Sequence, residues 1–484
     1  MNPLRRTKIV VTLGPSLDDP NMLERVILAG AVIFRANFSH GDPQVHESRI
    51  NQIRQFAVKN GLTVAILVDL QGPKIRIGRF KNGKITLVKD QIFTLDTQWD
   101  DLAGDEQAVS LGYKNLPNDV SAGDTLLLDD GRLVFNVLKT DGVRIECQVV
   151  VGGELSNNKG INRLGGGLSA TALTDKDRQD ILEAVRLEAD YIAVSFPRSA
   201  DDIHEARTLL KNAGGNQGII AKIERSEAIT HLHDIIQASD AVMIARGDLG
   251  VEIGDAELPA VQKKIIKTAR TFNKPVITAT QMLETMTYNT IPTRAEVSDV
   301  ANAVLDGTDA VMLSGETAVG LYPDKAVAAM DRICLSAEKH SGTKVMRYPK
   351  ESHMNYVDEA IAMATMYTAN HLDIKAIIAL TESGTTPLLM SRVNSNIPIY
   401  GLSRHLPTLR RMALYRDVYP IPFEATHIDR RVLNQAAIKE LQDRGILKKG
   451  DLVIITKGDL IGVHGRTNSM KIVTVGDIPI YSTE

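Results

Sequence analysis

The chain has 484 residues, of which 43% are hydrophobic and 24% charged, as in an ordinary globular protein. This length exceeds what one hydrophobic core organises, so we expect about two to four domains. The formal net charge of -3 provides no basic field for nucleic acid. The pattern after the basic first residues is not that expected of a signal peptide, and we expect no membrane-spanning segment. Cys147 and Cys334 lack metal-type spacing, which favours buried free thiols in the cytoplasm.

The first part of the chain alternates short apolar runs with helical patterns. These predict strands at 7–14, 32–39 and 64–70, and helices at 21–30 and 45–60. Such alternation is typical of βα units that build a parallel sheet.

The pattern changes between residues 72 and 168, where helical periodicity disappears. Short apolar runs are separated there by dipeptides that favour tight hairpin turns, because Asn, Asp and Gly tolerate positive φ. These are Asn82-Gly83, Asp130-Gly131 and Asp141-Gly142. We therefore predict an inserted all-β domain at residues 72–169.

The βα alternation resumes at Thr174, which can cap a helix, and predicts five more strands. They lie at 191–196, 218–224, 240–246, 275–281 and 310–316. Three strands before the insertion and five after it make eight, the number that closes a β/α barrel. The predicted fold class is thus α/β, with a (β/α)8 barrel formed by residues 1–71 and 170–345.

One barrel helix is marked clearly in the sequence. Thr293 and Glu296 have the spacing of a capping box, and Gly307 is placed to end the helix. The expected buried stripe between them comprises Val297, Val300, Ala301, Val304 and Leu305.

A further α/β domain is predicted at residues 346–484. A helix at 357–371 precedes a strand at 376–380, and α/β units continue to about residue 475. The segment from Thr381 to Thr386 lies between a strand and a helix, where hydroxyl and N–H groups suit a phosphate. By pattern alone, an ordinary capped turn is the better interpretation of this segment.

Polar side chains follow six of the predicted barrel strands, at the ends where β/α barrels carry their active sites. Lys222 and Glu224 lie two apart on one strand, so their side chains share a face. Asp248, after the next strand, supplies a second carboxylate. Two carboxylates that leave most coordination positions open suit Mg²⁺.

Cationic and backbone groups complete a site for a small anion. Lys222 is placed to stabilise a phosphoryl group in transfer. Arg35 and Arg76 offer bidentate phosphate donors, and Gly247 lets backbone N–H groups approach a substrate carboxylate. The chemistry indicated is metal-assisted phosphoryl transfer.

These residues lie in motifs that resemble pyruvate kinase along essentially the whole chain. Several separate runs match in order and at appropriate spacing. They are Arg35-Ala36-Asn37-Phe38-Ser39-His40, Gly72-Pro73-Lys74-Ile75-Arg76, Asn158-Lys159-Gly160, Ala221-Lys222-Ile223-Glu224, the run from Ala245 to Glu252, Ala279-Thr280-Gln281-Met282, and Ser314-Gly315-Glu316-Thr317.

The resemblance implies transfer of a phosphoryl group from phosphoenolpyruvate to ADP, giving pyruvate and ATP, the last step of glycolysis. Its implied catalytic residues are Lys222, Thr280 and Arg35, and Glu224 and Asp248 would hold Mg²⁺ or Mn²⁺. Its implied substrate-binding residues are Arg35, Lys222, Gly247, Asp248, Thr280, Ser314 and Glu316. Either Thr280 or a water would relay the proton to the enolate carbon. Asn37, His40, Arg76 and Lys159 would face the nucleotide, with the inserted domain closing as a lid.

The chain departs from the family at its monovalent-cation site. Many members require K⁺ and carry Thr, Lys and Glu where this chain has Leu70, Gln71 and Lys74. Asn37, Ser39 and Asp69 match the K⁺ ligands, whereas Leu70 offers only its carbonyl oxygen. We therefore expect K⁺ independence, with the Lys74 ammonium supplying the charge; the alternative is an exposed lysine beside a working K⁺ site.

The resemblance also turns the Thr381–Thr386 segment into an expected allosteric site. Thr381, Ser383, Gly384, Thr385 and Thr386 would hold a phosphorylated effector, helped by Lys457, Arg466 and Arg431. Because Glu382 would repel a second phosphate, the expected activator is a sugar monophosphate or AMP. The family further implies a homotetramer.

Two other functions fit part of the pattern. A metal-dependent lyase or aldolase acting on pyruvate or phosphoenolpyruvate would use the same metal site, but it has no nucleotide for Lys159 to cover. A non-catalytic effector-binding scaffold would not need Lys222, Glu224, Asp248 and Thr280 together.

Overall fold

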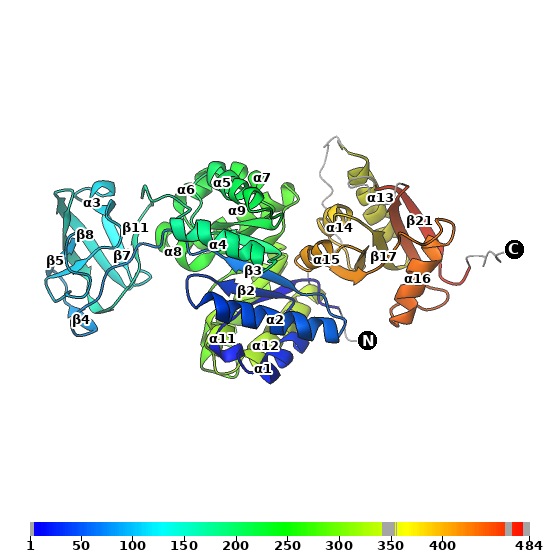
Figure 1. The fold of residues 1–484 in the computed structure, drawn as a ribbon, viewed down its shortest axis with the longest axis horizontal. Coiled ribbons are helices and arrows are strands. Elements are labelled where there is room, and N and C mark those ends of the chain that lie inside the picture. Colours follow the sequence, from blue (N-terminus) through cyan, green and yellow to red (C-terminus); the bar gives the residue numbers. More distant parts are fainter. Residues whose placement is uncertain (1–3, 341–353, 355, 460–466, 478–484) are drawn as a thin grey trace.

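The protein is described by a computed structural model, which covers residues 4–340, 354, 356–459 and 467–477. Three domains follow one another along its long axis, with the β barrel-like insertion at one end and the last α/β domain at the other (Figure 1). Eight parallel strands between them close into a barrel in the order β1-β16-β15-β14-β13-β12-β3-β2. The predicted fold class is therefore confirmed.

The barrel strands are shorter than the apolar runs that predict them. Their bounds are β1 Lys8–Thr12, β2 Ile33–Asn37, β3 Ala65–Asp69, β12 Tyr191–Val194, β13 Gly218–Ile223, β14 Ala241–Ala245, β15 Val276–Ala279 and β16 Ala310–Leu313. The predicted strand ends beyond Val194, Ala279 and Leu313 are wrong, because the backbone turns there. Phe196, Thr280 and Gln281 take positive φ values of 56°, 66° and 52°, and α11 (Gly315–Ala318) begins directly after Ser314.

The barrel is surrounded by helices, two of which begin at capping residues predicted from the sequence. They are α1 Pro20–Leu28, α2 Pro43–Lys59, α4 Asp175–Arg186, α5 Ala200–Asn212, α6 Ser226–Thr230, α7 Leu232–Ala238, α8 Arg246–Ile253, α9 Leu258–Thr271, α10 Arg294–Asp306 and α12 Pro323–His340. The capping boxes at Thr174 and Thr293 are both formed. Gly307 ends α10 at a φ of 95°, which only glycine adopts without strain.

The buried stripe of α10 differs from its prediction. Val300 and Val304 are buried as expected, and Ala303 joins them. Val297 and Leu305 are instead 37% and 50% exposed. The apolar pattern in the sequence therefore predicts a buried stripe that is too long, by one residue at each end of α10.

The inserted domain is all-β apart from α3 (Leu116–Asp119). Its six-stranded sheet has the order β11-β7-β8-β9-β5-β6, and β10 pairs with β4 in a second sheet. The bounds are β4 Lys84–Leu87, β5 Ile92–Asp96, β6 Ala108–Ser110, β7 Thr125–Leu128, β8 Leu133–Thr140, β9 Arg144–Val151, β10 Gly153–Ser156 and β11 Ile161–Arg163. The predicted turn glycines Gly83, Gly131 and Gly142 all have positive φ.

The C-terminal domain is a five-stranded sheet in the order β19-β18-β17-β20-β21, parallel except for β21. Its elements are α13 Val357–His371, β17 Ile374–Leu380, α14 Thr385–Ser391, β18 Ile399–Ser403, α15 Leu406–Met412, β19 Val418–Pro422, α16 Leu433–Asp443, β20 Leu452–Gly458 and β21 Thr467–Thr474. The predicted boundary between residues 345 and 346 lies outside the described residues.

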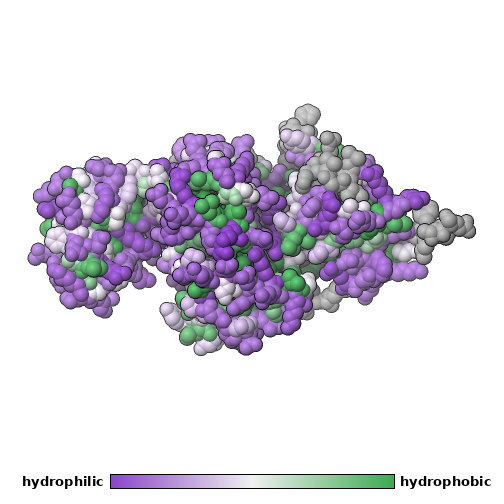
Figure 2. Space-filling model, viewed as in Figure 1, coloured by the Kyte–Doolittle hydropathy of each residue, from purple (hydrophilic) through white to green (hydrophobic). Residues whose placement is uncertain are grey.

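The barrel presents its two ends to different domains. At the base of β1, the Lys8 ammonium donates to the carbonyl of Val418 in the C-terminal domain at 2.6 Å. At the base of β16, the buried Asp309 carboxylate pairs with Arg392. The opposite ends of the strands, where β3 runs into the insertion, are left to form a site between barrel and inserted domain. Figure 2 shows an indentation between these two domains on the lower side of the view.

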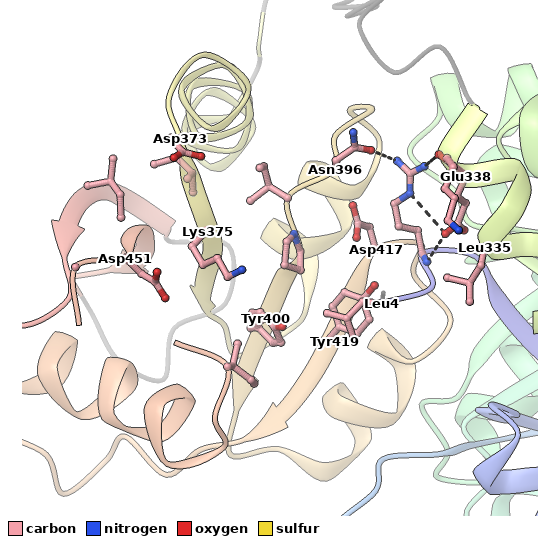
Figure 3. A pocket seen from close by; sticks show the side chains of 18 residues that line it. Leu4, Leu335, Glu338, Asp373, Lys375, Asn396, Tyr400, Asp417, Tyr419 and Asp451 are labelled. Atoms are coloured by element: carbon pink, nitrogen blue, oxygen red, sulfur yellow. Dashed lines mark hydrogen bonds and ion pairs between the residues drawn. The ribbon is translucent and has the colours of Figure 1, made fainter. Parts of the chain in front are cut away.

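A cavity of about 860 Å³ lies between the barrel base and the C-terminal domain. Figure 3 shows Leu335 and Glu338 on its barrel side and Lys375, Tyr400 and Asp451 on the other side. Its lining mixes acidic, basic and apolar side chains, so it favours no single class of ligand. It bears on the stability of the junction between the two domains, because a buried carboxyl lines it.

Asp417 lines this cavity and is a buried titratable group at the junction. Burial raises the pKa of its carboxyl to about 7, against the opposing pull of Arg6, Lys8 and Arg416. A carboxyl whose pKa is higher in the folded than in the unfolded state binds more protons when folded, so its contribution to stability falls as pH rises from about 4 to 7.

Replacing Asp417 by Asn should remove that penalty. Asn tolerates the positive φ of 63° at this position. We expect the free energy of unfolding to rise by about 1–2 kcal/mol at pH 8 and to change little at pH 5. Denaturant unfolding at both pH values measures this, with Asp373→Asn on the exposed rim as the control. A loss of stability at pH 8 would contradict the prediction.

Candidate active site

Four charged side chains meet inside the mouth of the barrel. On β13, Ile220 belongs to the barrel-interior core, whereas Ala221 and Ile223 pack toward the helices. The two-residue period of a strand therefore turns Lys222, and Glu224 just beyond it, toward the interior. The same alternation turns Arg35 on β2 and Asp69 on β3 inward.

Lys222 lies at the centre of this cluster. Its ammonium is 2.8 Å from Glu224 Oε1 and 3.2 Å from Asp69 Oδ1, and it donates to Ser195 Oγ at 2.6 Å. Burial alone would lower the pKa of this ammonium, but the Asp69 and Glu224 carboxylates outweigh burial and raise the pKa to about 12. Lys222 therefore carries a full positive charge at any physiological pH.

Arg35 is held in place by the carboxylate that it shares with Lys222. Its Nε donates to Asp69 Oδ2 at 2.6 Å, and its Nη1 donates to the Thr12 hydroxyl at 3.1 Å. Although burial opposes it, the charges of Lys222 and Arg35 hold the pKa of Asp69 below its usual value. Asp69 thus fixes two cations side by side, facing the same space.

Glu224 and Asp248 supply the two carboxylates predicted for a divalent metal. Glu224 is buried and accepts from the backbone N–H of Phe196 at 2.8 Å. Burial raises its pKa, Lys222 opposes this, and the neighbouring negative charge of Asp248 adds to it. Asp248 lies in the first turn of α8 and contacts the Lys74 ammonium at 3.1 Å.

The donor set fits Mg²⁺ better than a metal held only by protein. Among the described residues, no group of three or more His, Cys, Asp and Glu side chains is arranged to hold a metal ion. Two neighbouring carboxylates, one accessible, are what Mg²⁺ uses when substrate and water oxygens fill its other positions.

The Thr280 segment forms the wall beside these carboxylates. Thr280 Oγ1 accepts from the backbone N–H of Gly247 at 2.8 Å. Arg246 holds the strained turn by donating through Nη2 to the carbonyls of Thr280 and Gln281, at 2.7 and 2.9 Å. Its Nη1 pairs with Asp299 at 2.7 Å. Thr280 is therefore fixed against Gly247 by a neighbour buried beneath it.

Glu316 and Ser314 lie behind this wall. The buried Glu316 carboxylate accepts from the N–H groups of Leu283 at 3.0 Å and Ser314 at 2.7 Å. Burial raises the pKa of Glu316. Both of its oxygens are thus used to join two loops.

The predicted nucleotide residues come from both domains. Lys159 pairs with Asp129 inside the insertion at 2.7 Å, and Arg76 donates to the carbonyl of Asn158 at 2.8 Å. His40 lies on the barrel, where burial and then the charges of Arg76, Arg35 and Lys74 lower its pKa. An imidazole so placed is neutral at physiological pH and can accept as well as donate.

The expected K⁺ ligands are engaged within the protein. Asn37 Oδ1 accepts from the Ser39 N–H at 3.2 Å, and the Leu70 carbonyl accepts from the Ser195 hydroxyl at 2.7 Å. Asp69 is paired with Arg35 and Lys222. The one carboxylate of the expected set is therefore neutralised by two cations.

The predicted effector segment forms a hydroxyl-rich turn before α14. Thr381 Oγ1 accepts from the Gly384 N–H at 2.9 Å, and the Ser383 and Thr385 hydroxyls are 2.9 Å apart. Thr386 differs, because its side chain is buried with its hydroxyl 2.7 Å from that of Thr467. Gly384 takes a φ of 83°, as a left-handed position at a helix start requires.

The charged residues expected around that turn are placed less favourably. Arg431 pairs with Asp429 at 2.6 Å, and the predicted Arg466 lies outside the described residues. The Glu382 carboxylate contacts His405 Nε2 at 2.6 Å and Arg404 Nε at 3.4 Å. Its charge is partly offset, so its expected repulsion of a second phosphate is weaker than the sequence indicates.

Two contributors to the site were not predicted as such. Ser195, after β12, joins Lys222 to the Leu70 carbonyl, and Arg246 stabilises the Thr280 turn. In the sequence, Arg246 was the last residue of a predicted strand and part of the family run from Ala245 to Glu252, but no role was assigned to it. A buried cation in that position requires a partner, which is the signal that could have singled it out.

Taken together, the barrel, its inserted domain and a mouth with paired cations beside paired carboxylates define a phosphoryl-transferring barrel enzyme. The profile described as "Pyruvate kinase, barrel domain" matches residues 4–327, and that described as "Pyruvate kinase, alpha/beta domain" matches residues 359–473. The chain belongs to the pyruvate kinase family and is a phosphotransferase.

Individual relatives agree with this assignment over nearly the full length of this chain. Pyruvate kinase II of Salmonella typhimurium is 54% identical over 476 residues, which are 98% of this chain and 99% of the relative. Pyruvate kinase of Haemophilus influenzae is 54% identical over 459 residues, 94% of this chain and 96% of the relative. That of Sporosarcina psychrophila is 43% identical over 481 residues, 98% of this chain and 81% of the relative.

Two predictions from composition can also be compared with the structure. Cys147 and Cys334 are free and buried, and burial raises both thiol pKa values to about 12. Within the described residues, every helix is too short or too polar to cross a membrane.

Proposed function

We propose that the protein transfers the phosphoryl group of phosphoenolpyruvate to ADP, giving pyruvate and ATP in the last step of glycolysis. The observation that carries this proposal is the Lys222 ammonium, fixed between Asp69 and Glu224 and flanked by Arg35. Two permanently charged cations held side by side suit a phosphoryl group that passes between two oxygens.

In the proposed mechanism, side chains at the barrel mouth bind the substrate, orient it and stabilise the charge that moves during transfer. Arg35 binds the phosphate of phosphoenolpyruvate, and Lys222 stabilises the negative oxygens of the phosphoryl group during transfer. The substrate carboxylate would lie at the start of α8, beside Gly247 and Asp248, where the Gly247 N–H would exchange its bond to Thr280 Oγ1 for one to the substrate. The Thr280 hydroxyl, positioned by the Gly247 N–H, would relay a proton from water to the enolate carbon, or a water would deliver it directly.

Glu224 and Asp248 would hold the divalent metal, Mg²⁺ or Mn²⁺. When bound, it supplies positive charge that offsets the phosphoryl and substrate oxygens.

The inserted domain would act as a lid over the nucleotide. Arg76 and Lys159 belong to this domain, and Asn37 and His40 belong to the barrel. Closure would exclude water from the transferring group. This argues against a metal-dependent lyase or aldolase, which needs no such cover, and the intact charge cluster argues against a non-catalytic scaffold.

We further propose that the enzyme does not require K⁺. The Lys74 ammonium lies close enough to lower the pKa of His40, together with Arg76 and Arg35. It thus brings a positive charge toward His40, the residue that follows the Asn37–Ser39 segment where the family places K⁺. The pairing of Asp69 with two cations removes the main electrostatic attraction for another one.

The C-terminal domain is proposed to bind a phosphorylated activator at the turn formed by Thr381, Ser383, Gly384 and Thr385. Its hydroxyls and N–H groups suit one phosphate, which favours a sugar monophosphate or AMP. Because Glu382 is paired with His405 and Arg404, we expect discrimination against a bisphosphate to be modest.

We propose a cytoplasmic homo-oligomer, with four copies as the family expectation. Leu321 N–H donates to the Thr287 carbonyl at 2.9 Å, which brings two loops together. On them, Tyr288, Ile291, Val319 and Leu321 are each more than half exposed. An apolar surface of this kind is typical of a protein–protein contact, and sedimentation equilibrium would reveal a monomer if the proposal is wrong.

One coupled assay tests activity, cation class and regulation together. Turnover with phosphoenolpyruvate, ADP and Mg²⁺ in tetramethylammonium buffer should change by less than about two-fold when K⁺ is added, because Lys74 already supplies the charge. Lys74→Met should lower turnover without K⁺. A sugar monophosphate or AMP should activate more than fructose 1,6-bisphosphate. Strong activation of the unmodified enzyme by K⁺ would exclude K⁺ independence, and a selective response to the bisphosphate would exclude the effector class.

A further inference from the structure

Lys74 connects the root of the inserted domain with a carboxylate of the metal site. It lies five residues after the end of β3, in the segment that enters the insertion. Its ammonium is 3.1 Å from Asp248 Oδ1, and the two side chains are 29% and 22% exposed. The contact is therefore an ion pair across the boundary between two domains, at the barrel mouth.

The stem of Lys74 lies against the strand by which the inserted domain returns. A Cβ added to Gly160 would lie 3.5 Å from Lys74 Cε. The next residues pair with the same strand, because Ile161 N–H donates to the Ile75 carbonyl and Ile77 N–H donates to the Lys159 carbonyl, both at 3.0 Å. Movement of Lys74 is thus transmitted to both chain segments that join the domains.

Helix α8 receives both of these segments. Asp248 in its first turn contacts Lys74. Near its other end, the Glu252 carbonyl accepts from the Gly165 N–H at 3.0 Å, and the Glu252 carboxylate accepts from the Ser226 N–H at 2.9 Å. The helix that carries a metal ligand is therefore also the barrel surface on which the root of the inserted domain rests.

A divalent cation at Asp248 and the Lys74 ammonium repel each other and compete for the same carboxylate. Charges of this kind a few ångströms apart interact strongly even at a partly exposed site. We propose that Lys74 is a strap that holds the inserted domain on α8 in the metal-free protein, and that metal binding at Asp248 releases it. This inference rests on the proposed metal site at Glu224 and Asp248.

The strap predicts opposite effects of one substitution. Lys74→Met keeps the length of the stem but removes the charge. It should weaken K⁺-free catalysis, where the charge is needed, and strengthen metal binding by the free enzyme, where the charge competes. A lysine with only a structural role would not shift these two quantities in opposite directions.

The first test measures Mn²⁺ binding to the substrate-free protein by electron paramagnetic resonance. Lys74→Met should bind Mn²⁺ about five-fold more tightly than the unmodified protein, the upper range for a partly exposed ion pair. Lys81→Met, which removes an inserted-domain lysine paired with Asp105, should leave affinity unchanged. Equal affinities of the unmodified protein and Lys74→Met would overturn the strap, with the metal site intact.

A second variant distinguishes failure of the strap from failure of the metal site. Asp248→Asn should weaken Mn²⁺ binding at least ten-fold, because it removes a charged ligand. Unchanged binding in this variant would overturn the metal site and the strap with it. It would leave the phosphotransferase assignment untouched, since that rests on the family and on Lys222.

Hydrogen–deuterium exchange of residues 72–78 tests release directly. Mn²⁺ should increase exchange in this segment of the unmodified protein, because the strap detaches from α8. In Lys74→Met, exchange should be high already and should respond little to Mn²⁺. The same increase in both proteins, or slower exchange on Mn²⁺ binding to the unmodified protein, would overturn the proposal.

Discussion

Lys222→Ala should lower kcat about a thousand-fold or more, because it removes the cation that faces the transferring phosphoryl group. Lys222 is fully charged, with a pKa raised to about 12. Alanine can replace neither its charge nor its hydrogen bond to Ser195. The coupled assay measures this, with Lys211→Ala on the surface of α5 as the control for the substitution itself. Turnover within ten-fold of the unmodified enzyme would contradict the role given to Lys222.

The same substitution should also destabilise the barrel, contrary to the simplest expectation for an active-site residue. Asp69 keeps Arg35, but the buried Glu224 loses its cation. Removing one partner of a buried pair costs about 3 kcal/mol. Since burial already raises the pKa of Glu224, the deficit should be largest above neutral pH and should narrow as falling pH protonates this carboxyl. Unfolding at two pH values separates this effect from catalysis.

Arg246→Lys should lower kcat/KM about a hundred-fold although Arg246 is not placed to contact substrate. Thr280 and Gln281 occupy positive φ at some energetic cost, and the Arg246 guanidinium spans both of their carbonyls. A lysine ammonium cannot make this fork. The turn should relax, and a displacement of about 1 Å at Thr280 suffices for such a loss.

Asp299→Asn is the matched control for Arg246. It weakens the Arg246–Asp299 ion pair, whose carboxylate is 37% exposed, while it leaves both carbonyl contacts in place. We expect less than about a three-fold change in kcat/KM for this variant. If Arg246→Lys were equally mild, the Thr280 turn would not depend on Arg246 and its strain would need another support.

The sequence predicted the elements of the barrel because each depends on local signals. The βα alternation marked the eight strands, and the capping residues Thr174 and Thr293 marked helix starts. It failed at strand ends such as Val194 and Leu313, where apolar residues continue into turns. Those turns follow from tertiary contacts, for example the Glu316 carboxylate that accepts from the Ser314 N–H.

The candidate site likewise has features that the sequence predicts and features that it does not. The two-residue spacing of Lys222 and Glu224 already placed both on one face of a strand. The sequence could not reveal that Asp69 would neutralise both Arg35 and Lys222, because these residues are 34 and 153 positions from it and meet only when the barrel closes. Nor could it reveal that the partners of Glu382 reduce its charge.

The sequence alone therefore determined the α/β barrel, its insertion and the types of residue at the barrel mouth, because periodicity and turn chemistry are local. Only the tertiary structure decided which charges neutralise one another. Electrostatic interactions depend on distance in space and on burial, and neither quantity can be read from the order of the residues. The ion pair between Lys74 and Asp248, on which the proposed strap depends, is of this second kind.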